Sequence, residues 1–516
     1  MRSSLVRSLL LGAVAPVALA LAAAAQTGPP NILLIVMDDT GVNLFGAYNR
    51  NLAYLEVTGL EPNEHQVTPN IEALAEQGLL FRNLWSTPLC TPTRTTLFTG
   101  LYGFRTGVIT NGIYLDPSRP TLTRRLRDEA PYAVREAIGK WHLSSYYPLP
   151  DYGTLVNTPT QLGFTRYQGS LSGGYVGYSW PSDPPPSPLP NPPIPTYSDY
   201  LTSHEISEAI GFVQQPHTGP WFLWLALHAA HSPWTESETP TLSPTCNSIA
   251  FTPRRVRCRQ LEVMDNEIGN LIAAIDLGTT TVILVGDNGT ADQGQDIPGT
   301  VNRGGKGTVY EGGINVPLIV AGAGVSANDP TTIEETDALV HTTDIFATVL
   351  DLAGVAAPNQ LIDGVSFEPV LYGSPGPRSY VYTDGSVTSG TCPVELPSHH
   401  DVAIRDITYK LIRRASTSSV HDYQFYNLVT DPSESIELPE SGAEFEALKA
   451  TIDQFDQEAT ASPCVPPPGG GGACGVGPEL MPALWLLFAL RRRDVARRRV
   501  ASRAFERGMR QPPLAR

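Results

Sequence analysis

Positive charge is scarce over most of this sequence. The 516 residues include 35 Lys and Arg against 51 Asp and Glu, which gives a formal net charge of −16. Residues 1–25 contain two of the arginines, and residues 491–516 contain ten more beside two acids, so the remaining body has 23 basic and 49 acidic groups, a net of −26. Such a surface argues against nucleic acid as a partner, and weakly against long polyanionic polysaccharides unless a local basic cleft overrides it.

Cysteine is also scarce, with six residues in the whole chain. In an oxidising compartment these residues favour disulfide bridges. Cys246 and Cys258 are close enough in sequence to close a loop, and Cys392 and Cys464 are a second candidate pair. Because four cysteines allow three connectivities, this pairing is a preference among alternatives. It leaves Cys90 and the cysteine of the C-terminal tail unpaired.

The N-terminus has the composition of a targeting segment. Residues 1–25 combine two arginines, an apolar run and a small-residue finish at Ala25. A buried N-terminal helix would explain neither the basic start nor the alanines. We therefore predict a signal peptide and a bacterial exported protein.

The C-terminus has three parts: a Pro/Gly-rich linker at 461–480 that includes Cys474, an apolar segment at 481–490 and a basic tail at 491–516. The apolar segment is short against the roughly 20 residues that a membrane-spanning helix needs. The order resembles the tripartite surface-sorting tails called MYXO-CTERM, in which the cysteine is the processing or lipid-anchor site. A simple membrane anchor is the alternative. Either predicts a protein held at the cell envelope or cell surface, and the first adds envelope sorting machinery as a partner.

The region between the two ends alternates strand-like and helical patterns without an internal repeat. We predict an α/β domain over 30–372, with a mixed, mostly parallel sheet flanked by helices. Continuous apolar runs, typical of buried parallel strands, occupy 32–37, 221–227 and 281–285. Helical patterns occupy 71–77, 258–274 and 343–352.

Residues 373–460 predict a smaller C-terminal α+β subdomain. Its expected elements are short strands of an antiparallel sheet at 380–383, 402–404 and 409–413 and a final helix at 444–458. A proline-rich stretch at 181–195 predicts an extended surface loop inserted in the first domain.

Polar residues follow two of the predicted buried strands. Asp38 and Asp39 end the first, and Asp287 and Asn288 follow a later one. Ligands of open α/β sheets bind outside the carboxyl ends of the strands, and carboxylate and amide oxygens suit Ca²⁺ or Mg²⁺. The alternative for either pair alone is a turn after the strand.

Cys90 precedes a predicted short helix. Thr91 suits the N-cap and the following proline suits the first helical position, with the helix ending at Gly100 or Gly103. Cys90 would then lie just outside a helix N-terminus, where an anion is favoured, and the guanidinium of Arg94, one turn later, could reach the same site. A merely buried or bridged cysteine does not predict this context.

The motif Cys90-x-Pro-x-Arg94, continued by Thr99-Gly100, matches the signature of the sulfatases, and the chain resembles that family over about residues 30–440. The remaining matches follow in family order and are IVMDD at 35–39, Gly139-Lys140-Trp141-His142, His228-Ala-Ala-His231-Ser-Pro233, Asp287-Asn288-Gly289 and Gly305-Lys306-Gly307 through Glu311-Gly312-Gly313. The resemblance is to formylglycine-dependent type I sulfatases of the alkaline phosphatase superfamily, so it implies an alkaline-phosphatase-like fold.

The resemblance also implies a mechanism for sulfate monoesters. A maturation enzyme would oxidise Cys90 to formylglycine, whose hydrate attacks sulfur. A Ca²⁺ ion, or Mg²⁺, would be held by Asp38, Asp39, Asp287, Asn288 and the modified Cys90. Lys140, Lys306 and Arg94 would neutralise charge on the sulfuryl oxygens.

The resemblance also assigns the two proton transfers and leaves several positions open. His231 or Lys306 would protonate the departing alcohol, and His142 would take a proton from the second hydroxyl. His228 receives no role, since it could merely close its strand. The family serine that contacts sulfate is Ser170 or Ser172. Residues 131–138 and Asn315 depart from the family pattern at positions that are not catalytic in the resemblance.

Two other functions are compatible with the residues. An enzyme of the same superfamily could act on phosphate or phosphonate esters. A second metal ion would support that alternative, but Lys140 and Lys306 occupy positions where basic side chains replace such a metal. A surface protein could bind sulfated ligands without turnover if Cys90 remains a thiol. The substrate class stays open among aryl sulfates, sulfated sugars and glycan ends.

Overall fold

The computed structural model describes residues 28–48, 68–111, 115–116, 118–144, 159–171, 199–242, 244–249, 252–291, 303–326, 332–355, 362–385, 400–415 and 422–461. The predicted signal peptide, the proline-rich loop, Ser172, Cys392, Cys464 and the three-part C-terminal tail lie outside these residues. Within the described ranges, no helix has both the length and the apolar composition that crossing a bilayer requires.

A large sheet of eight strands forms the centre of the described structure, in the order β4-β3-β5-β1-β6-β7-β2-β8. The run from β4 to β6 is parallel, β7 is antiparallel to both β6 and β2, and β8 is parallel to β2. The predicted mixed, mostly parallel sheet is thereby confirmed. The strands are β1 (Asn31–Met37), β2 (Gly78–Trp85), β3 (Val134–Lys140), β4 (Arg166–Ser170), β5 (Trp221–Ala226), β6 (Thr280–Gly286), β7 (Leu318–Gly322) and β8 (Glu334–His341).

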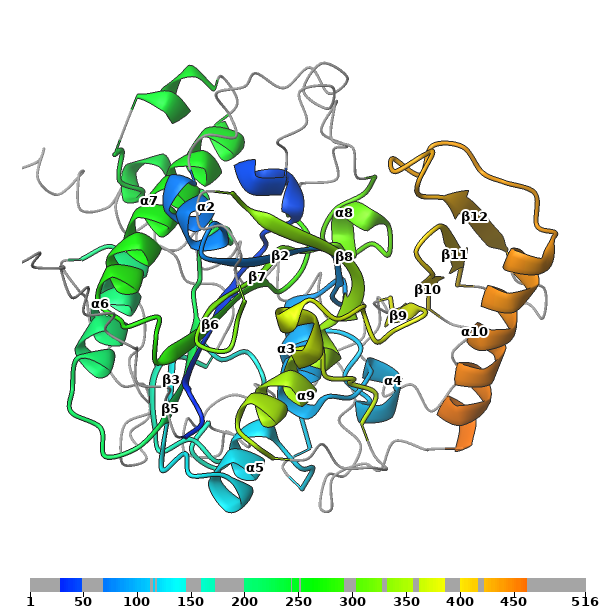
Figure 1. Cartoon of the computed structure of the whole chain (residues 1–516). Coiled ribbons are helices and arrows are strands. Elements are labelled where there is room, and N and C mark those ends of the chain that lie inside the picture. The colour runs from blue at the N-terminus through cyan, green and yellow to red at the C-terminus, as the bar shows by residue number, and fades with distance from the viewer. Residues whose placement is uncertain are drawn as a thin grey trace, which may run out of the picture.

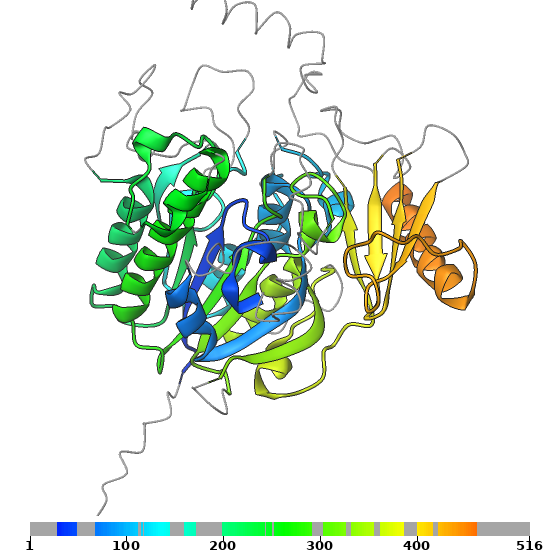
Figure 2. The same ribbon diagram turned by 90° about the horizontal axis from the view of Figure 1, so that it is seen from above.

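Helices cover both faces of this sheet (Figures 1 and 2). The central strand β1 is apolar from Ile32 to Met37, because its alternate side chains enter two separate cores, one on each face. One face carries α2 (Pro69–Ala75), α6 (Leu201–Val213) and α7 (Thr252–Ala273), and the other carries α3 (Cys90–Thr99), α5 (Leu122–Glu129) and α9 (Thr342–Leu352).

A second sheet lies beside the first, with α10 (Ala443–Ala461) on its outer face (Figure 2). It is antiparallel in the order β12-β11-β10-β9, with β9 at Val381–Asp384, β10 at Val402–Arg405, β11 at Tyr409–Arg413 and β12 at Tyr423–Asn427. The expected short antiparallel sheet and final helix are confirmed, whereas β12 was not predicted. The domain limits at 372 and 373 stay a prediction. The short helices α4 (Gly103–Thr106) and α8 (Glu311–Ile314) contact the second sheet, through Phe104 with Asp384 of β9 and through Glu311 with Lys410 of β11.

Two local predictions have definite outcomes. The helix expected at 71–77 spans Pro69–Ala75 instead, and Gly78 is the first residue of β2. A side chain at Gly78 would begin 2.2 Å from the Val320 carbonyl oxygen of β7, so close strand pairing explains this glycine. The predicted disulfide between Cys246 and Cys258 is present and joins a 3₁₀ turn to α7.

Candidate active site

The two polar strand ends meet at one edge of the large sheet. Strands β1 and β6 are parallel neighbours in register to their last residues, so the pairs that follow them lie together. The Asp39 amide N–H donates to an Asp287 carboxylate oxygen at 3.1 Å, and the Asn288 side-chain amide donates to Asp39 Oδ1 at 2.9 Å. All four side chains, including that of Asp38, are buried. The predicted juxtaposition of Asp38 and Asp39 with Asp287 and Asn288 is confirmed.

The backbone at Asp39 lets two consecutive carboxylates share one site. Successive side chains of a strand point to opposite faces, yet Asp38 and Asp39 both reach the Cys90 sulfur. Asp39 adopts a left-handed conformation with φ of 56°, which Asp tolerates better than most residues. The chain therefore leaves strand geometry at Asp39 and turns its carboxylate toward Cys90.

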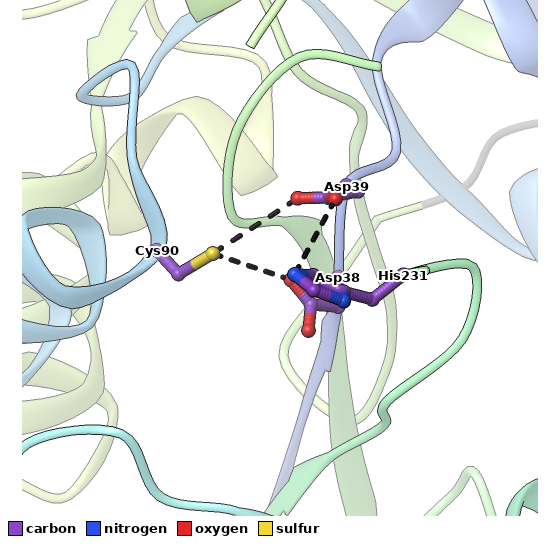
Figure 3. A group of neighbouring side chains, drawn as sticks. All are labelled: Asp38, Asp39, Cys90 and His231. Atoms are coloured by element: carbon purple, nitrogen blue, oxygen red, sulfur yellow. Dashed lines mark hydrogen bonds and ion pairs between the residues drawn. The ribbon is translucent and has the colours of Figure 1, made fainter. Parts of the chain in front are cut away.

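Cys90 lies opposite these carboxylates, with its sulfur pointing at both (Figure 3). The Sγ atom is 3.4 Å from Asp38 Oδ1, 3.9 Å from Asp39 Oδ1 and 3.6 Å from the Lys140 ammonium. It is a free, fully buried thiol. Burial, and then the charge of Asp287, raise the pKa of this thiol. At neutral pH the unmodified cysteine is therefore protonated and a poor nucleophile.

The start of α3 differs from the prediction. We expected Thr91 as N-cap with Cys90 outside the helix, but Cys90 is the first helical residue and Leu89 holds the cap position without a side-chain bond. The Thr91 hydroxyl instead donates to the His142 carbonyl oxygen at 3.0 Å, because α3 packs against the segment that follows β3. The helix ends at Gly100, whose φ of 69° is the left-handed conformation expected of a C-cap glycine.

Each of the three site carboxylates has its own cation. Arg94 donates to Asp287 at 2.9 Å and to the Lys140 carbonyl oxygen at 2.7 Å. The Lys140 ammonium pairs with Asp38, and the Lys306 ammonium lies 2.5 Å from Asp39 Oδ1. These three basic residues, all predicted from the sequence, therefore converge on the strand-end carboxylates rather than on solvent.

The neighbouring charges shift the acids in opposite directions. Burial by itself raises the pKa of Asp38, but the positive charges of Lys140, His231, Arg94 and Lys306 together hold that pKa well below its usual range. Burial and the negative charge of Asp38 raise the pKa of Asp287 to about 7. A divalent cation bound among these acids would favour the ionised form of both.

The three histidines occupy different positions. The His231 Nε2 atom is 3.8 Å from Asp39 Oδ2, and its Nδ1 atom is within 2.6 Å of the Ser232 carbonyl oxygen. His142 is mostly buried, and its Nδ1 atom has no hydrogen-bond partner among the described residues. Burial, and then the charges of Lys140 and Arg94, lower the pKa of His142. His228 pairs through Nδ1 with Glu205 of α6 at 2.5 Å.

Glu205 was missed by sequence reasoning because it precedes His228 by 23 residues and lies on a separate helix. No local motif links them. Of the two serines considered for sulfate contact, Ser170 ends β4 beside β3 and is buried, and Ser172 falls in the stretch that the structure leaves undescribed.

One group of side chains in the site could hold a metal ion. Ligand atoms of Asp38, Asp39, Cys90 and His231 lie within 4.8 Å of one another. The Asn288 Oδ1 atom is buried and makes no hydrogen bond to any residue that the structure describes. A buried amide oxygen without a donor costs free energy unless another partner satisfies it. The predicted ligand Asp287 is not in this group, and its carboxylate accepts hydrogen bonds from Arg94 and from the Asp39 amide N–H.

Three carboxylates, three basic side chains and a buried cysteine at the carboxyl ends of parallel strands define an enzyme site for an anionic ester. Comparison with known proteins gives the family. The chain matches the sulfatase family model over residues 30–355, and the model for the C-terminal part of N-sulphoglucosamine sulphohydrolase over residues 305–458. It therefore belongs to the sulfatase family and is a sulfuric ester hydrolase.

Individual relatives agree with this assignment. Human N-acetylgalactosamine-6-sulfatase is 30% identical over 387 residues, which cover 66% of this chain and 66% of the relative. Human arylsulfatase A is 29% identical over 408 residues, covering 70% and 72%. Among solved structures, Ps i-CgsB in complex with k-i-k-neocarrahexaose has a TM-score of 0.64 at 21% identity, with 84% of this chain and 94% of that chain covered. PsFucS1 sulfatase from Pseudoalteromonas sp. has a TM-score of 0.60 at 21% identity, with 84% and 90% covered. These structures support the fold.

Proposed function

We propose that this sulfatase cleaves sulfate monoesters with a nucleophile made from Cys90 by oxidation to formylglycine. The position of the Cys90 sulfur carries the proposal, because it lies 3.4 Å from an Asp38 oxygen and 3.6 Å from the Lys140 ammonium. Because the pKa of the Cys90 thiol is raised, the unmodified cysteine is a poor nucleophile for direct attack on sulfur. The aldehyde of formylglycine hydrates to a geminal diol, which supplies a hydroxyl nucleophile without any thiolate.

We further propose that Asp38, Asp39, Asp287 and Asn288 hold a divalent cation, with Ca²⁺ preferred over Mg²⁺. Their donor atoms are oxygens, which hard cations prefer, and the unpartnered Asn288 Oδ1 atom supports the assignment within the described residues. When bound, the cation polarises a sulfuryl oxygen and favours the deprotonated hydroxyl of the nucleophile.

The basic side chains of the site stabilise the charge that develops on the sulfuryl group. Lys140 and Lys306 stand beside Asp38 and Asp39 and are already held in place by them. Preorganised cations of this kind act without reorganisation during the reaction. Arg94, which pairs with Asp287, adds a third positive charge from the side of α3.

Protons move at two positions in the proposed reaction. The His231 side chain is 18% exposed, so it, or Lys306, donates a proton to the alcohol that leaves toward solvent. His142, whose Nδ1 atom is buried and has no hydrogen-bond partner among the described residues, accepts the proton of the second diol hydroxyl. Sulfate is then expelled and the aldehyde returns. A serine could perform only the first half, because its sulfate ester has no second hydroxyl.

We propose a sulfated carbohydrate as the substrate, at the end of a short glycan or on a single sugar. Relatives named N-acetylgalactosamine-6-sulfatase, and a structural neighbour solved with D-glucosamine-2-N,6-O-disulfate, support a sugar. The acidic body of the chain supports a small substrate rather than the interior of a long polyanion. The composition of the two chain ends supports export and retention at the cell envelope.

Mass spectrometry of the peptide that contains Cys90, from enzyme made in a host with a maturation system, tests the central step. We expect the aldehyde in a fraction that rises with specific activity across preparations. Fully active enzyme that contains only the thiol would overturn the nucleophile. Turnover of a sulfated sugar against its phosphorylated counterpart, in the same preparations, tests the substrate class.

A further inference from the structure

Lysine is the rarest charged residue of the chain, with four positions in 516: 140, 306, 410 and 449. Two of these lie in the site, and Lys449 lies on α10 paired with Asp453. Lys410 is fully buried as the second residue of β11, in the second sheet. An ammonium group in the interior costs free energy unless it is paired, so the partners of Lys410 show what its charge holds in place.

Lys410 pairs with two acids from different parts of the chain. Its Nζ atom is 3.0 Å from Glu311 Oε1 and 2.8 Å from Glu434 Oε1, and it lies 4.8 Å from the centre of the Trp85 ring of β2. Glu311 is the first residue of α8, which lies beside the second sheet (Figure 1). Lys410 therefore connects the small sheet to both α8 and the large sheet.

Glu434 forms hydrogen bonds to both ends of the segment 303–312, which carries Lys306. Its carboxylate accepts the Glu311 amide N–H at 2.7 Å, and its backbone carbonyl accepts from the Arg303 guanidinium at 2.9 Å. The segment also closes on itself, because the Gly312 amide N–H donates to the Arg303 carbonyl oxygen at 2.9 Å. Residues 303–312 thus form a loop whose base is fixed by Glu434, Lys410 and Glu311.

Backbone hydrogen bonds fix the position of Lys306 within this loop. The Lys306 amide N–H donates to the Thr290 carbonyl oxygen at 3.1 Å, and the next amide donates to the Pro88 carbonyl oxygen at 2.8 Å. These contacts place the peptide between the segment after β6 and the segment before Cys90. The base of the loop and these two contacts together hold the Lys306 ammonium against Asp39, which it contacts at 2.5 Å, so a shift at the base would disturb this contact.

We propose that Lys410, Glu311 and Glu434 are positioning residues that set the place of Lys306 in the site, so that the second sheet supports catalysis from a distance. The inference rests on the proposed role of Lys306 in charge stabilisation. Arg405, 3.5 Å from Glu311, supplies the second positive charge of this buried group, so two cations balance two acids. None of the three positioning residues needs to contact the substrate.

A double-mutant cycle tests the proposal. We expect Lys410→Met to lower kcat about 10- to 100-fold, the range for a misplaced catalytic group, with a smaller change in KM. In the Lys306→Ala background the same substitution should change kcat less than twofold, since the group it positions is gone. Each variant is assayed well below its measured Tm, with conversion of Cys90 quantified by mass spectrometry.

Arg413→Met is the matched control, because Arg413 is a second buried cation of β11 that pairs with Asp456 of α10 on the opposite face. We expect it to lower Tm and leave kcat within about threefold. Equal losses in kcat for both variants, or an undiminished Lys410→Met effect without Lys306, would overturn the positioning role. If Lys410→Met does not fold, the Lys410→Met/Glu434→Gln variant, which removes one charge of each sign, takes its place in the cycle. Full activity of Lys306→Ala would instead contradict the proposed function.

Discussion

The central strands of the eight-stranded sheet and strand β11 of the four-stranded sheet place their buried charges differently. The central strands β1, β5 and β6 of the large sheet contain no charged residue, and charges begin only past their carboxyl ends, at Asp38 and Asp287. The small sheet buries Lys410 and Arg413 within β11 itself. In the large sheet the charges lie past the carboxyl ends of the central strands, where a ligand can contact them. In the small sheet the buried charges form ion pairs with other elements, so the small sheet has a structural role.

The largest expected loss of activity follows from a change in the site at the carboxyl ends of the large sheet's central strands. Replacing Cys90 by Ala removes the proposed nucleophile, so we expect sulfate release to fall by at least about 10⁴-fold. The fold should persist because the substitution shortens one small side chain at the start of α3. Sulfate release from a generic aryl sulfate and circular dichroism measure the two outcomes. Normal turnover by this variant would refute the proposed chemistry.

Removal of metal comes next in expected size. Chelation should lower kcat/KM by roughly 10²-fold or more, since a Lewis acid at the sulfuryl oxygen is worth several kcal/mol. Ca²⁺ should restore activity and raise Tm, because an ion that binds only the folded state at 100 times its Kd adds about 2.7 kcal/mol. The Cys90→Ala variant should still show a rise in Tm with Ca²⁺, because it keeps Asp38, Asp39, Asp287 and Asn288. Undiminished activity in metal-free enzyme would argue against the cation.

Two matched core substitutions compare the helix layer of the large sheet with that of the small sheet. Phe98 of α3 and Phe455 of α10 are both buried in aromatic clusters, so truncation of either to Ala should cost about 3–5 kcal/mol of unfolding free energy. Phe98→Ala should also lower kcat about tenfold or more, because α3 carries Cys90 and Arg94. Phe455→Ala should leave kcat within about threefold. Urea unfolding and steady-state kinetics on both variants distinguish the layers, and equal kcat losses would remove the distinction.

The predictable part of the site follows from local rules. Apolar runs that end in Asp or Asn identify buried strands and their polar ends, and parallel strands bring those ends to one edge. The same rules do not predict β12, a short strand of three aromatic and two polar residues. They also miss the true start of α3, where Thr91 makes a tertiary contact with His142 instead of a cap.

The amino-acid order alone specifies the strand and helix patterns, the motif around Cys90 and the family resemblance, because each depends on residues that are near neighbours in the chain. Which cation faces which acid is decided by tertiary structure. Asp39 meets Asn288 across 249 positions and Lys410 meets Glu311 across 99. Such pairs form only when the sheets and helices have packed, since burial removes water as the competing partner and makes each charge depend on the group opposite it.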